Sequence, residues 1–469
     1  MTEDATHTAP TLRQGLSPWA SAALLAGTVI GTGIFLVPST MARETGAVEL
    51  VFAVWVFGAL LSLAGALSYA ELGASMPSAG GEYIFLSRAY GPLWGFLFGW
   101  QQIVMGKTGS IAGIAIAFSL FLGYFVSGLD ADLVQYETGI GLFRMTGLQL
   151  AAIGAIVLLT LVNSFGVATG GALQSLLTAI KIGAILALVV LVFGSGAGSW
   201  EQFHQPPPPD DRDTISRLTG MGAALAAALW AYDGWNNLTM VSEEIRNPHR
   251  TIPRVLILGV LGVASVYIAA NLAYFYALPF VAIQHSNRVA QDVATHILGA
   301  AGGTALTLAA LISTFAALNG SILSGARIFY AMSRDGLFFQ RIADLHPTFR
   351  TPIKALMLQG VLAASLIVAL GHDKAAFERT LDYALFGTWG FYAVTALSVI
   401  ILRLRHPELP RPYLTLGYPW IPLLFSLVAL LFCVSIGLRR PDETLSGLAL
   451  LAAGLPFYLY WHRQQNGQH

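Results

Sequence analysis

Apolar runs of about 20 residues recur along the whole chain and are separated by short polar segments. Each run is long enough to cross a hydrocarbon core about 30 Å thick at about 1.5 Å per residue. A spanning segment must satisfy its own backbone polar groups, which favours helices. The pattern therefore predicts an all-α membrane protein whose twelve transmembrane helices lie over residues 17–45, 48–76, 92–126, 146–168, 171–195, 216–244, 252–278, 302–333, 353–371, 379–404, 414–437 and 444–463.

Two of the predicted helices are interrupted by residues that weaken a helix. The first contains the stretch GTVIGTG over residues 27–33, and a glycine in a helix interior costs about 1 kcal/mol relative to alanine. The second, over 216–244, contains Asp233, Gly234, Asn236 and Asn237. Gly31 and Gly234 are separated by 203 positions. This spacing predicts a polar tail over 1–16, two five-helix halves over 17–195 and 216–404, and two additional helices within 414–463.

A broken helix in each half is typical of the binding site of an inverted-repeat transporter. Free N–H groups at the start of a half-helix favour an anion, and glycine lets a ligand touch the backbone. The alternative is that the small residues only allow helices to pack closely. The two breaks together, with a carboxylate at Asp233 in one of them, favour a substrate site.

Composition supports the membrane class and limits other chemistry. The chain of 469 residues is 55% hydrophobic and 11% charged, has a formal net charge of +0, and has a mean hydropathy of +0.65. Its only cysteine, Cys433, lies in an apolar run, so a disulfide framework or a thiolate metal cluster is excluded. The histidines show no ligand spacing, and we find no cluster of nucleophile, acid and base. We therefore expect no enzyme activity, no metal, no cofactor and no nucleic-acid partner.

The distribution of basic residues predicts the orientation. An even number of spans puts both termini on one side of the membrane. The segments on that side hold 14 Lys and Arg residues and the opposite segments hold 9, while Lys107 and Lys181 are intramembrane. Because an excess of Lys and Arg marks cytoplasmic segments, we expect both termini in the cytoplasm.

Several stretches resemble the amino acid–polyamine–organocation (APC) transporters, and most closely the bacterial members of their L-type amino acid transporter family. The resemblance covers about residues 17–440. It rests on GTVIGTGIF (27–35), YAELGASMPSAGGEYIFLSRAYGP (69–92), LWAYDGWNNLTMVSEEIRNPHRTIPR (229–254), LNGSILSGARIFYAMSRDG (318–336) and HPTFRTP (346–352). It implies the LeuT-type fold of five plus five inverted helices, alternating access, and sodium-independent transport that is usually exchange.

The resemblance also implies where an amino acid binds. Its carboxylate would lie on backbone amides around Thr32–Ile34, and its ammonium would face carbonyls of Ile30 and of residues 230–232. Trp230 matches an aromatic residue that closes over the substrate from outside, although it could be an ordinary packed tryptophan. The family often has Gly-Ser-Gly at the first break, whereas this chain has Gly-Thr-Gly, which keeps a hydroxyl. The expected substrate-binding residues are Ile30, Gly31, Thr32, Gly33, Ile34, Trp230, Ala231, Tyr232, Asp233 and Gly234.

Lys181 lies in the middle of the predicted fifth helix, where a charge is a functional hypothesis by default. The resemblance implies that it takes the place of a sodium ion held by related sodium-coupled transporters, and that Ser313 supplies a hydroxyl beside it. Lys181 would then be a fixed cation or a proton carrier. The alternative is a lysine that extends to the interface.

Other polar residues are candidates for the central cavity, namely Lys107 and Asn319. The stretch GKTGS around Lys107 is not a phosphate loop, because residue 101 is glutamine rather than the required glycine. We expect Lys107 to pair with Asp233, since an unpaired buried charge is unfavourable; packing of Lys107 between helices is the alternative. Charged residues near the predicted inner ends of helices could form gate salt bridges or lie in solvated loops: Glu71, Glu82, Glu243, Glu244, Arg246, Arg250, Arg254, Arg327, Arg334 and Asp335.

Together these observations predict a sodium-independent exchanger of small to medium neutral L-amino acids in the inner membrane of a bacterium. The expected partners are the amino acid and the lipid bilayer. Animal members of the resembled family bind a heavy subunit through a cysteine after the third helix, but residues 127–145 contain no cysteine, which excludes that disulfide. A proton-coupled symporter, or a transporter of cationic amino acids or polyamines that uses Asp233, is the alternative within transport; a membrane sensor or channel is an alternative outside it.

Overall fold

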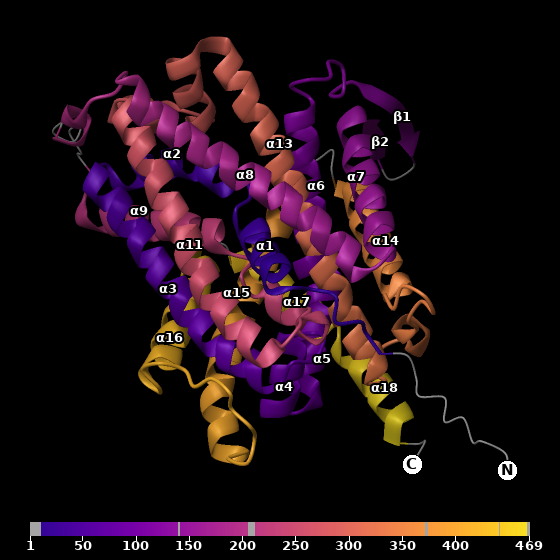
Figure 1. The fold of residues 1–469 in the computed structure, drawn as a ribbon. Helices are drawn as coiled ribbons and strands as arrows, with labels where there is room; N and C mark the ends of the chain where they lie inside the picture. Colours follow the sequence, from indigo (N-terminus) through magenta and orange to yellow (C-terminus); the bar gives the residue numbers. More distant parts are fainter. Residues whose placement is uncertain (1–10, 139–140, 205–211, 371–373, 440, 467–469) are drawn as a thin grey trace.

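The computed structural model describes residues 11–138, 141–204, 212–370, 374–439 and 441–466. The first ten residues of the predicted N-terminal tail therefore lie outside the description. Within the described ranges, ten helices are long and apolar enough to cross a membrane, and the bent pair α1 (Pro18–Val29) and α2 (Gly33–Thr45) gives an eleventh span. The predicted span over 216–244 is divided between two helices and a break, and it is not among these eleven (Figure 1).

The helices of the first half follow the predicted order closely. After α1 and α2 come α3 (Val48–Ser75), α4 (Glu82–Tyr90), α5 (Pro92–Gln101), the π-helical turn η1 (Gln102–Gly106), α6 (Lys107–Leu122), α7 (Gly147–Ser164) and α8 (Val167–Ser195). The segments α5, η1 and α6 together make one span. The short helix α4 was not predicted as an element of its own.

The second half begins with the 3-10 turn η2 (Trp200–His204) and contains the second broken helix. The elements are α9 (Thr214–Tyr232), α10 (Asn237–Met240), η3 (Ser242–Glu244), α11 (Pro248–Ala277), α12 (Phe280–His285), α13 (Val289–Arg334), η4 (Gln340–Ala343), α14 (Ile353–Leu370) and α15 (Lys374–Arg405). Helix α13 is kinked at Gly299, where φ is +68°. Three further helices close the chain: α16 (Trp420–Arg439), α17 (Pro441–Ala452) and α18 (Leu455–Asn466).

A two-stranded antiparallel hairpin was not predicted. Strands β1 (Asp132–Thr138) and β2 (Gly141–Thr146) pair in the connection between α6 and α7. The hairpin runs directly into a capped helix, because Thr146 and Gln149 form a reciprocal capping box at the start of α7. We call the side of the molecule that carries this hairpin the hairpin face and the opposite side the α4 face (Figure 1).

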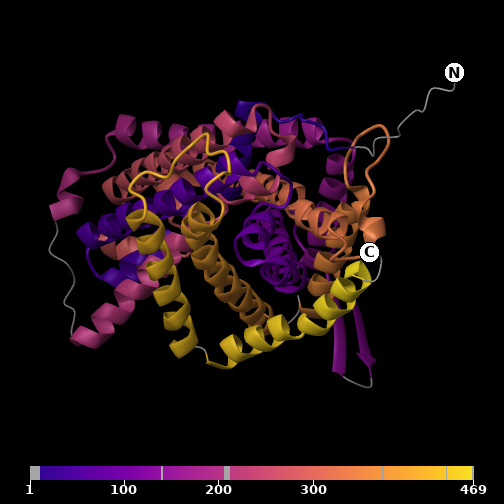
Figure 2. The same ribbon diagram turned by 90° about the horizontal axis from the view of Figure 1, so that it is seen from below.

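The core lies between the long helices rather than between sheets. Helices α3 and α11 pack against each other, and Trp55 of α3 makes edge-to-face contacts with Tyr232 and Tyr267 at ring distances of 5.6 and 5.2 Å. Seen from below, α16, α17 and α18 lie along one edge of the molecule (Figure 2). Helix α1 packs against α8, α11 and α13, and α9 packs against α2 and α3. The breaks therefore lie beside other helices, where irregular backbone can be tolerated in a membrane protein.

Candidate functional site

The first break separates α1 from α2 over residues 30–32. Helix α1 ends at Val29, and Thr32 precedes α2 without a hydrogen bond from its side chain to the helix start. The first N–H groups of α2 thus have no cap from Thr32, which leaves donors at a positive helix end. A Cβ built on Gly31 would have no described atom within 4 Å. The break therefore has open space beside Gly31, where Gly31 and Thr32 are partly exposed.

Lys181 of α8 lies against the carbonyl groups of the first break. Its side chain is 0% exposed, and Nζ donates to the carbonyl oxygens of Gly27 at 2.7 Å and Ile30 at 2.5 Å. The Ser313 hydroxyl of α13 donates to the same Ile30 oxygen at 3.0 Å. Lys181 does not extend to an interface, so the alternative of a snorkelling lysine does not describe this side chain.

The second break covers residues 233–236, between α9 and α10, and it touches the first helix directly. The Thr28 hydroxyl of α1 donates to the carbonyl oxygen of Gly234 at 3.0 Å. Gly234 has φ of +110°, and a Cβ there would lie 3.3 Å from the backbone of Thr28. Glycine is required at this position because other residues rarely adopt that φ and the helices approach too closely for a side chain.

The start of α2 packs closely on the end of α9. A Cβ on Gly33 would lie 2.8 Å from the Cβ of Ala231 and 3.8 Å from the ring of Trp230. Trp230 remains 44% exposed, whereas Ala231 and Tyr232 are buried. The two breaks are thus neighbours, as expected, and Trp230 is the exposed aromatic residue beside them.

Tyr267 of α11 connects both broken helices and was missed in the sequence. Its hydroxyl lies 3.0 Å from the carbonyl oxygen of Val29 and 2.9 Å from that of Ala231, so it can donate to either one. Its side chain is fully buried. The sequence did contain a signal for it, namely a tyrosine in the middle of an apolar span, because a buried hydroxyl needs a hydrogen-bond partner.

The expected direct pair between Lys107 and Asp233 is wrong. Among the described residues, Lys107 forms no ion pair with Asp233; Nζ instead donates to Oδ1 of Asn237. Asp233 accepts a hydrogen bond from the hydroxyl of Tyr392, in α15, at 2.8 Å. The non-helical backbone at the break turns Asn237, rather than Asp233, toward α6. Tyr392 was also missed in the sequence.

Asn319 of α13 lies in a buried network of amides rather than at either break. It accepts from Asn163 of α7 at 2.8 Å and donates to Gln174 of α8 at 2.7 Å. Thr178, one turn after Gln174, donates to the carbonyl of Ala23 in α1 at 3.0 Å. Asn319 therefore joins α7, α8 and α13, and its amide is occupied by protein partners.

The α4 face is held by ion pairs between elements far apart in sequence. Arg327 of α13 forms two hydrogen bonds to Glu244, at 2.6 and 2.8 Å, with both side chains 0% exposed. Arg334 donates to Glu243 at 2.9 Å. Arg327 and Glu244 are therefore buried rather than solvated, whereas Arg334 and Glu243 are partly exposed.

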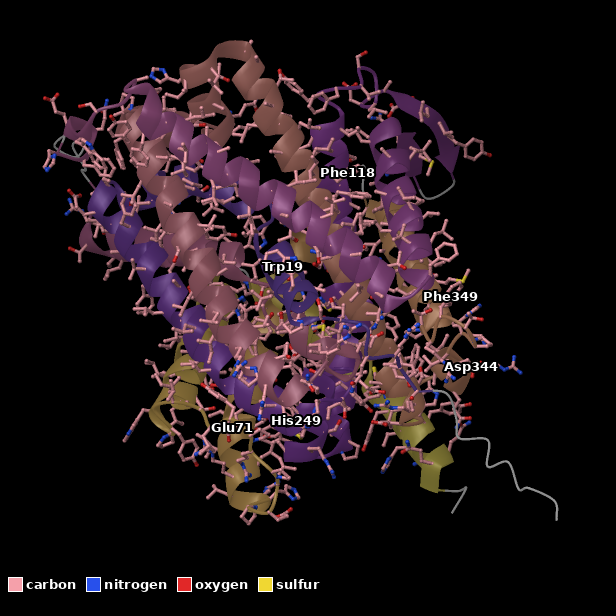
Figure 3. All side chains as sticks on the ribbon, viewed as in Figure 1. Trp19, Glu71, Phe118, His249, Asp344 and Phe349 are labelled. Atoms are coloured by element: carbon pink, nitrogen blue, oxygen red, sulfur yellow. The ribbon has the colours of Figure 1, made fainter. Side chains whose placement is uncertain are left out.

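Glu71 ties α3 to α15 on the same face. It accepts two hydrogen bonds from Arg403, at 2.8 and 2.6 Å. Figure 3 shows Glu71 near the lower end of the molecule, close to His249, which bonds the carbonyl of Ala74. Phe118 lies toward the opposite side, near the hairpin (Figure 3).

The arrangement of the two breaks can bind an amphoteric molecule. The described residues contain no cluster of three His, Cys, Asp or Glu side chains that could hold a metal ion. The two breaks supply N–H donors at the start of α2, non-helical backbone, and the carboxylate of Asp233. Such a combination suits a ligand that carries both an anion and a cation.

Comparison with known proteins assigns the class. The family model described as amino acid permease matches residues 16–447. The chain is 34% identical over 442 residues to the serine/threonine exchanger SteT of Bacillus subtilis (strain 168), covering 93% of this chain and 94% of that protein.

Animal transporters are similar over nearly the same range. Identity is 30% to the mouse b(0,+)-type amino acid transporter 1, covering 93% of this chain and 85% of that protein, and 31% to the human large neutral amino acids transporter small subunit 2, covering 94% and 79%. The chain belongs to the amino acid permease family.

Proposed function

We propose that the protein is a sodium-independent exchanger of small to medium neutral L-amino acids that works by alternating access. The observation that carries the proposal is the contact between the two broken helices, where Thr28 bonds Gly234 beside the open space at Gly31. In this proposal the substrate carboxylate lies on the amides of Thr32, Gly33 and Ile34. Its ammonium faces the carbonyls of Ile30 and of residues 230–232.

The position of Lys181 supports independence from sodium. Its ammonium donates to two carbonyl oxygens of the first helix and lies 3.5 Å from the carbonyl oxygen of Ser313. A cation that is covalently part of the chain can satisfy these oxygens without an ion from solution. We propose that Lys181 fulfils this role and that the Ser313 hydroxyl assists it.

Exchange is supported by the similarity to the bacterial relative, a serine/threonine exchanger. We further propose two five-helix repeats over 17–195 and 216–404, with the helices in 414–463 as an addition. We also propose that it lies in the inner membrane of a bacterium, because a bacterial exchanger is among its relatives. The excess of Lys and Arg on the terminal side supports a cytoplasmic location of both termini. On that basis the α4 face is cytoplasmic, and its ion pairs separate when the site opens inward.

Asp233 supports a second candidate, transport of cationic amino acids. Its carboxylate is at the second break, and Tyr392 accounts for one hydrogen bond to it. A carboxylate there could bind the charged group of a lysine or arginine side chain. A competition assay separates the two candidates. Unlabelled neutral amino acids should displace the labelled substrate of a neutral exchanger, and unlabelled lysine or arginine should displace that of a cationic transporter.

The experiment is counterflow in proteoliposomes of the purified protein, without sodium. Uptake of labelled L-serine should be much faster into vesicles loaded with unlabelled serine than into empty ones, and a proton uncoupler should leave it unchanged. Uptake that requires sodium would contradict the role of Lys181. Equal uptake into empty vesicles that stops with the uncoupler would instead indicate a proton-coupled symporter, and no accumulation would indicate a sensor or channel.

A further inference from the structure

The side-chain amides of two consecutive asparagines at the second break form hydrogen bonds with side chains of opposite charge. Nδ2 of Asn236 donates to Oε1 of Glu82 at 2.6 Å. The next residue, Asn237, accepts at Oδ1 from the ammonium of Lys107. All four side chains are buried. The break between α9 and α10 is therefore held from α4 by an acid and from α6 by a base.

The backbone before Glu82 places this acid beside α10. Glu82 is the first residue of α4, and it follows Gly80 and Gly81, whose φ angles are +107° and +53°. The N–H of Gly80 donates to the carbonyl of Met240 in α10 at 2.9 Å. A Cβ on Gly81 would lie 3.0 Å from the backbone nitrogen of Met240. These glycines let the start of α4 press directly against α10.

The base, Lys107, follows an irregular turn of its helix. Lys107 follows the π-helical turn η1, and the Thr108 hydroxyl bonds the carbonyl of Ile103 at 2.5 Å. The Lys107 stem passes close to Gly325 of α13, where a Cβ would lie 3.1 Å from its Cδ, and Nζ is 3.5 Å from the Ser324 hydroxyl. Such π-helical turns occur frequently at functional sites.

The Glu82 carboxyl is not fully satisfied. Its Oε2 has no hydrogen-bond partner among the described residues. Burial raises the pKa of Glu82 to about 7, opposed by the bond from Asn236 and by the positive charge of Lys107. The other titratable groups facing it are Asp233, whose charge also raises that pKa, and the hydroxyls of Tyr69 and Tyr392.

We propose that Glu82 and Lys107 are positioning residues, which hold the second break through Asn236 and Asn237 in the shape that binds substrate. We name these four residues the amide clamp. The proposal rests on the proposed function, because it assumes that substrate binds at this break. Neither charged residue needs to touch the substrate, since each acts through the amide that it bonds.

The clamp makes substrate affinity depend on the charge of Glu82. An ionised carboxylate accepts a stronger hydrogen bond than a neutral carboxyl, and it compensates Lys107. Glu82 is ionised above its pKa and loses that charge as the pH falls through it. Affinity should therefore be high on the alkaline side and lower on the acidic side.

The test measures KM for sodium-free counterflow of labelled L-serine at about pH 6 and about pH 8, one unit either side of that pKa. For the wild type, KM at the lower pH should be about five-fold higher, the difference between a charge-assisted and a neutral hydrogen bond. Glu82→Gln keeps an oxygen for Asn236 but cannot ionise, so its KM should be independent of pH and close to the acidic wild-type value. Lys107→Met should also flatten the profile, and the double variant should be no worse than either single variant.

Exposed residues provide matched controls. Glu408→Gln and Lys354→Met should keep the wild-type profile, because their side chains are 72% and 50% exposed. Lys107→Arg keeps the charge and should keep the pH dependence, so it tests the clamp even where Lys107→Met fails to fold. A wild-type pH profile in Glu82→Gln, or a double variant whose KM reflects the product of two independent effects, would overturn the clamp.

A failure of the amide clamp can be distinguished from a failure of the proposed function. Absence of counterflow in the wild type would contradict the proposed exchange. The clamp would then be tested by the rise in melting temperature on adding L-serine at the two pH values. A rise that is larger at the higher pH in the wild type and equal in Glu82→Gln would support it, and equal rises in the wild type would contradict it.

Discussion

The ammonium nitrogen of Lys181 lies 2.7 Å from the carbonyl oxygen of Gly27, in the last turn of α1 before the first helix breaks. Both groups are buried, so neither has water as an alternative partner. The break is thereby tied to α8 through a single side chain. Loss of that side chain would remove the donor to the Gly27 carbonyl and one of the two donors to the Ile30 carbonyl, which would keep the Ser313 hydroxyl.

Lys181→Ala should lower the rate of exchange by at least about ten-fold, because unsatisfied buried acceptors are unfavourable and the break loses its anchor. Replacing sodium with choline should leave the wild type unchanged. Both are measured by counterflow in proteoliposomes. Lys354→Ala, on an exposed surface, is the matched control and should retain the wild-type rate. Full activity of Lys181→Ala would remove the proposed role of this lysine.

The breaks could be located in the sequence because glycine and polar residues interrupt apolar runs. The position of Lys181 beside the first break came instead from the resemblance to the APC transporters. The partner of Lys107 could not be predicted in this way. It depends on the π-helical turn before Lys107 and on the φ of +110° at Gly234, and neither leaves a mark in the hydrophobic pattern.

The environment of Glu82 could not be predicted from the sequence either. It was grouped with charges near the predicted inner ends of helices, yet it is 0% exposed and bonded to Asn236. A charge that follows two glycines after a span looks like part of a solvated loop. Only the folded path of residues 80–82 against α10 reveals that the carboxyl is buried.

Trp230→Ala should raise KM and slow transport strongly while the protein remains folded, because the proposed outer lid would be lost. Trp230→Phe should keep most of the activity, since it preserves an aromatic ring. Trp420→Ala is the control, because Trp420 is 74% exposed at the start of α16. Kinetics of exchange, with melting temperature as the check on folding, decide the matter. Unchanged KM and maximal rate in Trp230→Ala would show that it is an ordinary surface residue.

Gly33→Ala should impair transport by pushing α2 away from α9. The added Cβ would lie 2.8 Å from the Cβ of Ala231, which is closer than such atoms approach in real structures. Gly183→Ala in α8 is the control, because its Cβ would meet no described atom within 4 Å. Counterflow rates of the two variants should differ clearly. Equal rates would mean that the close contact between α2 and α9 is unimportant for transport.

The buried ion pair on the α4 face should be essential for stability. Glu244→Gln leaves Arg327 buried without its counter-charge, which should destabilise the folded protein by about 3–5 kcal/mol. Asp344→Asn breaks the exposed pair with Lys354 and should cost only about 0–1 kcal/mol. Melting curves in detergent compare them. Similar melting temperatures for the two variants would contradict the importance of the buried pair.

Substrate is proposed to bind between the two helix breaks, and a substitution at Gly31 tests that position. A side chain at Gly31 would project into open space, so Gly31→Val should fold as well as the wild type but occupy the site. The measurement is the rise in melting temperature on adding L-serine, since a ligand that binds only the folded state stabilises it. We expect a clear rise for the wild type and none for Gly31→Val. The control Gly154→Val, whose Cβ also meets no described atom within 4 Å, should show the wild-type rise. An undiminished rise in Gly31→Val, with equal stability without ligand, would contradict the site.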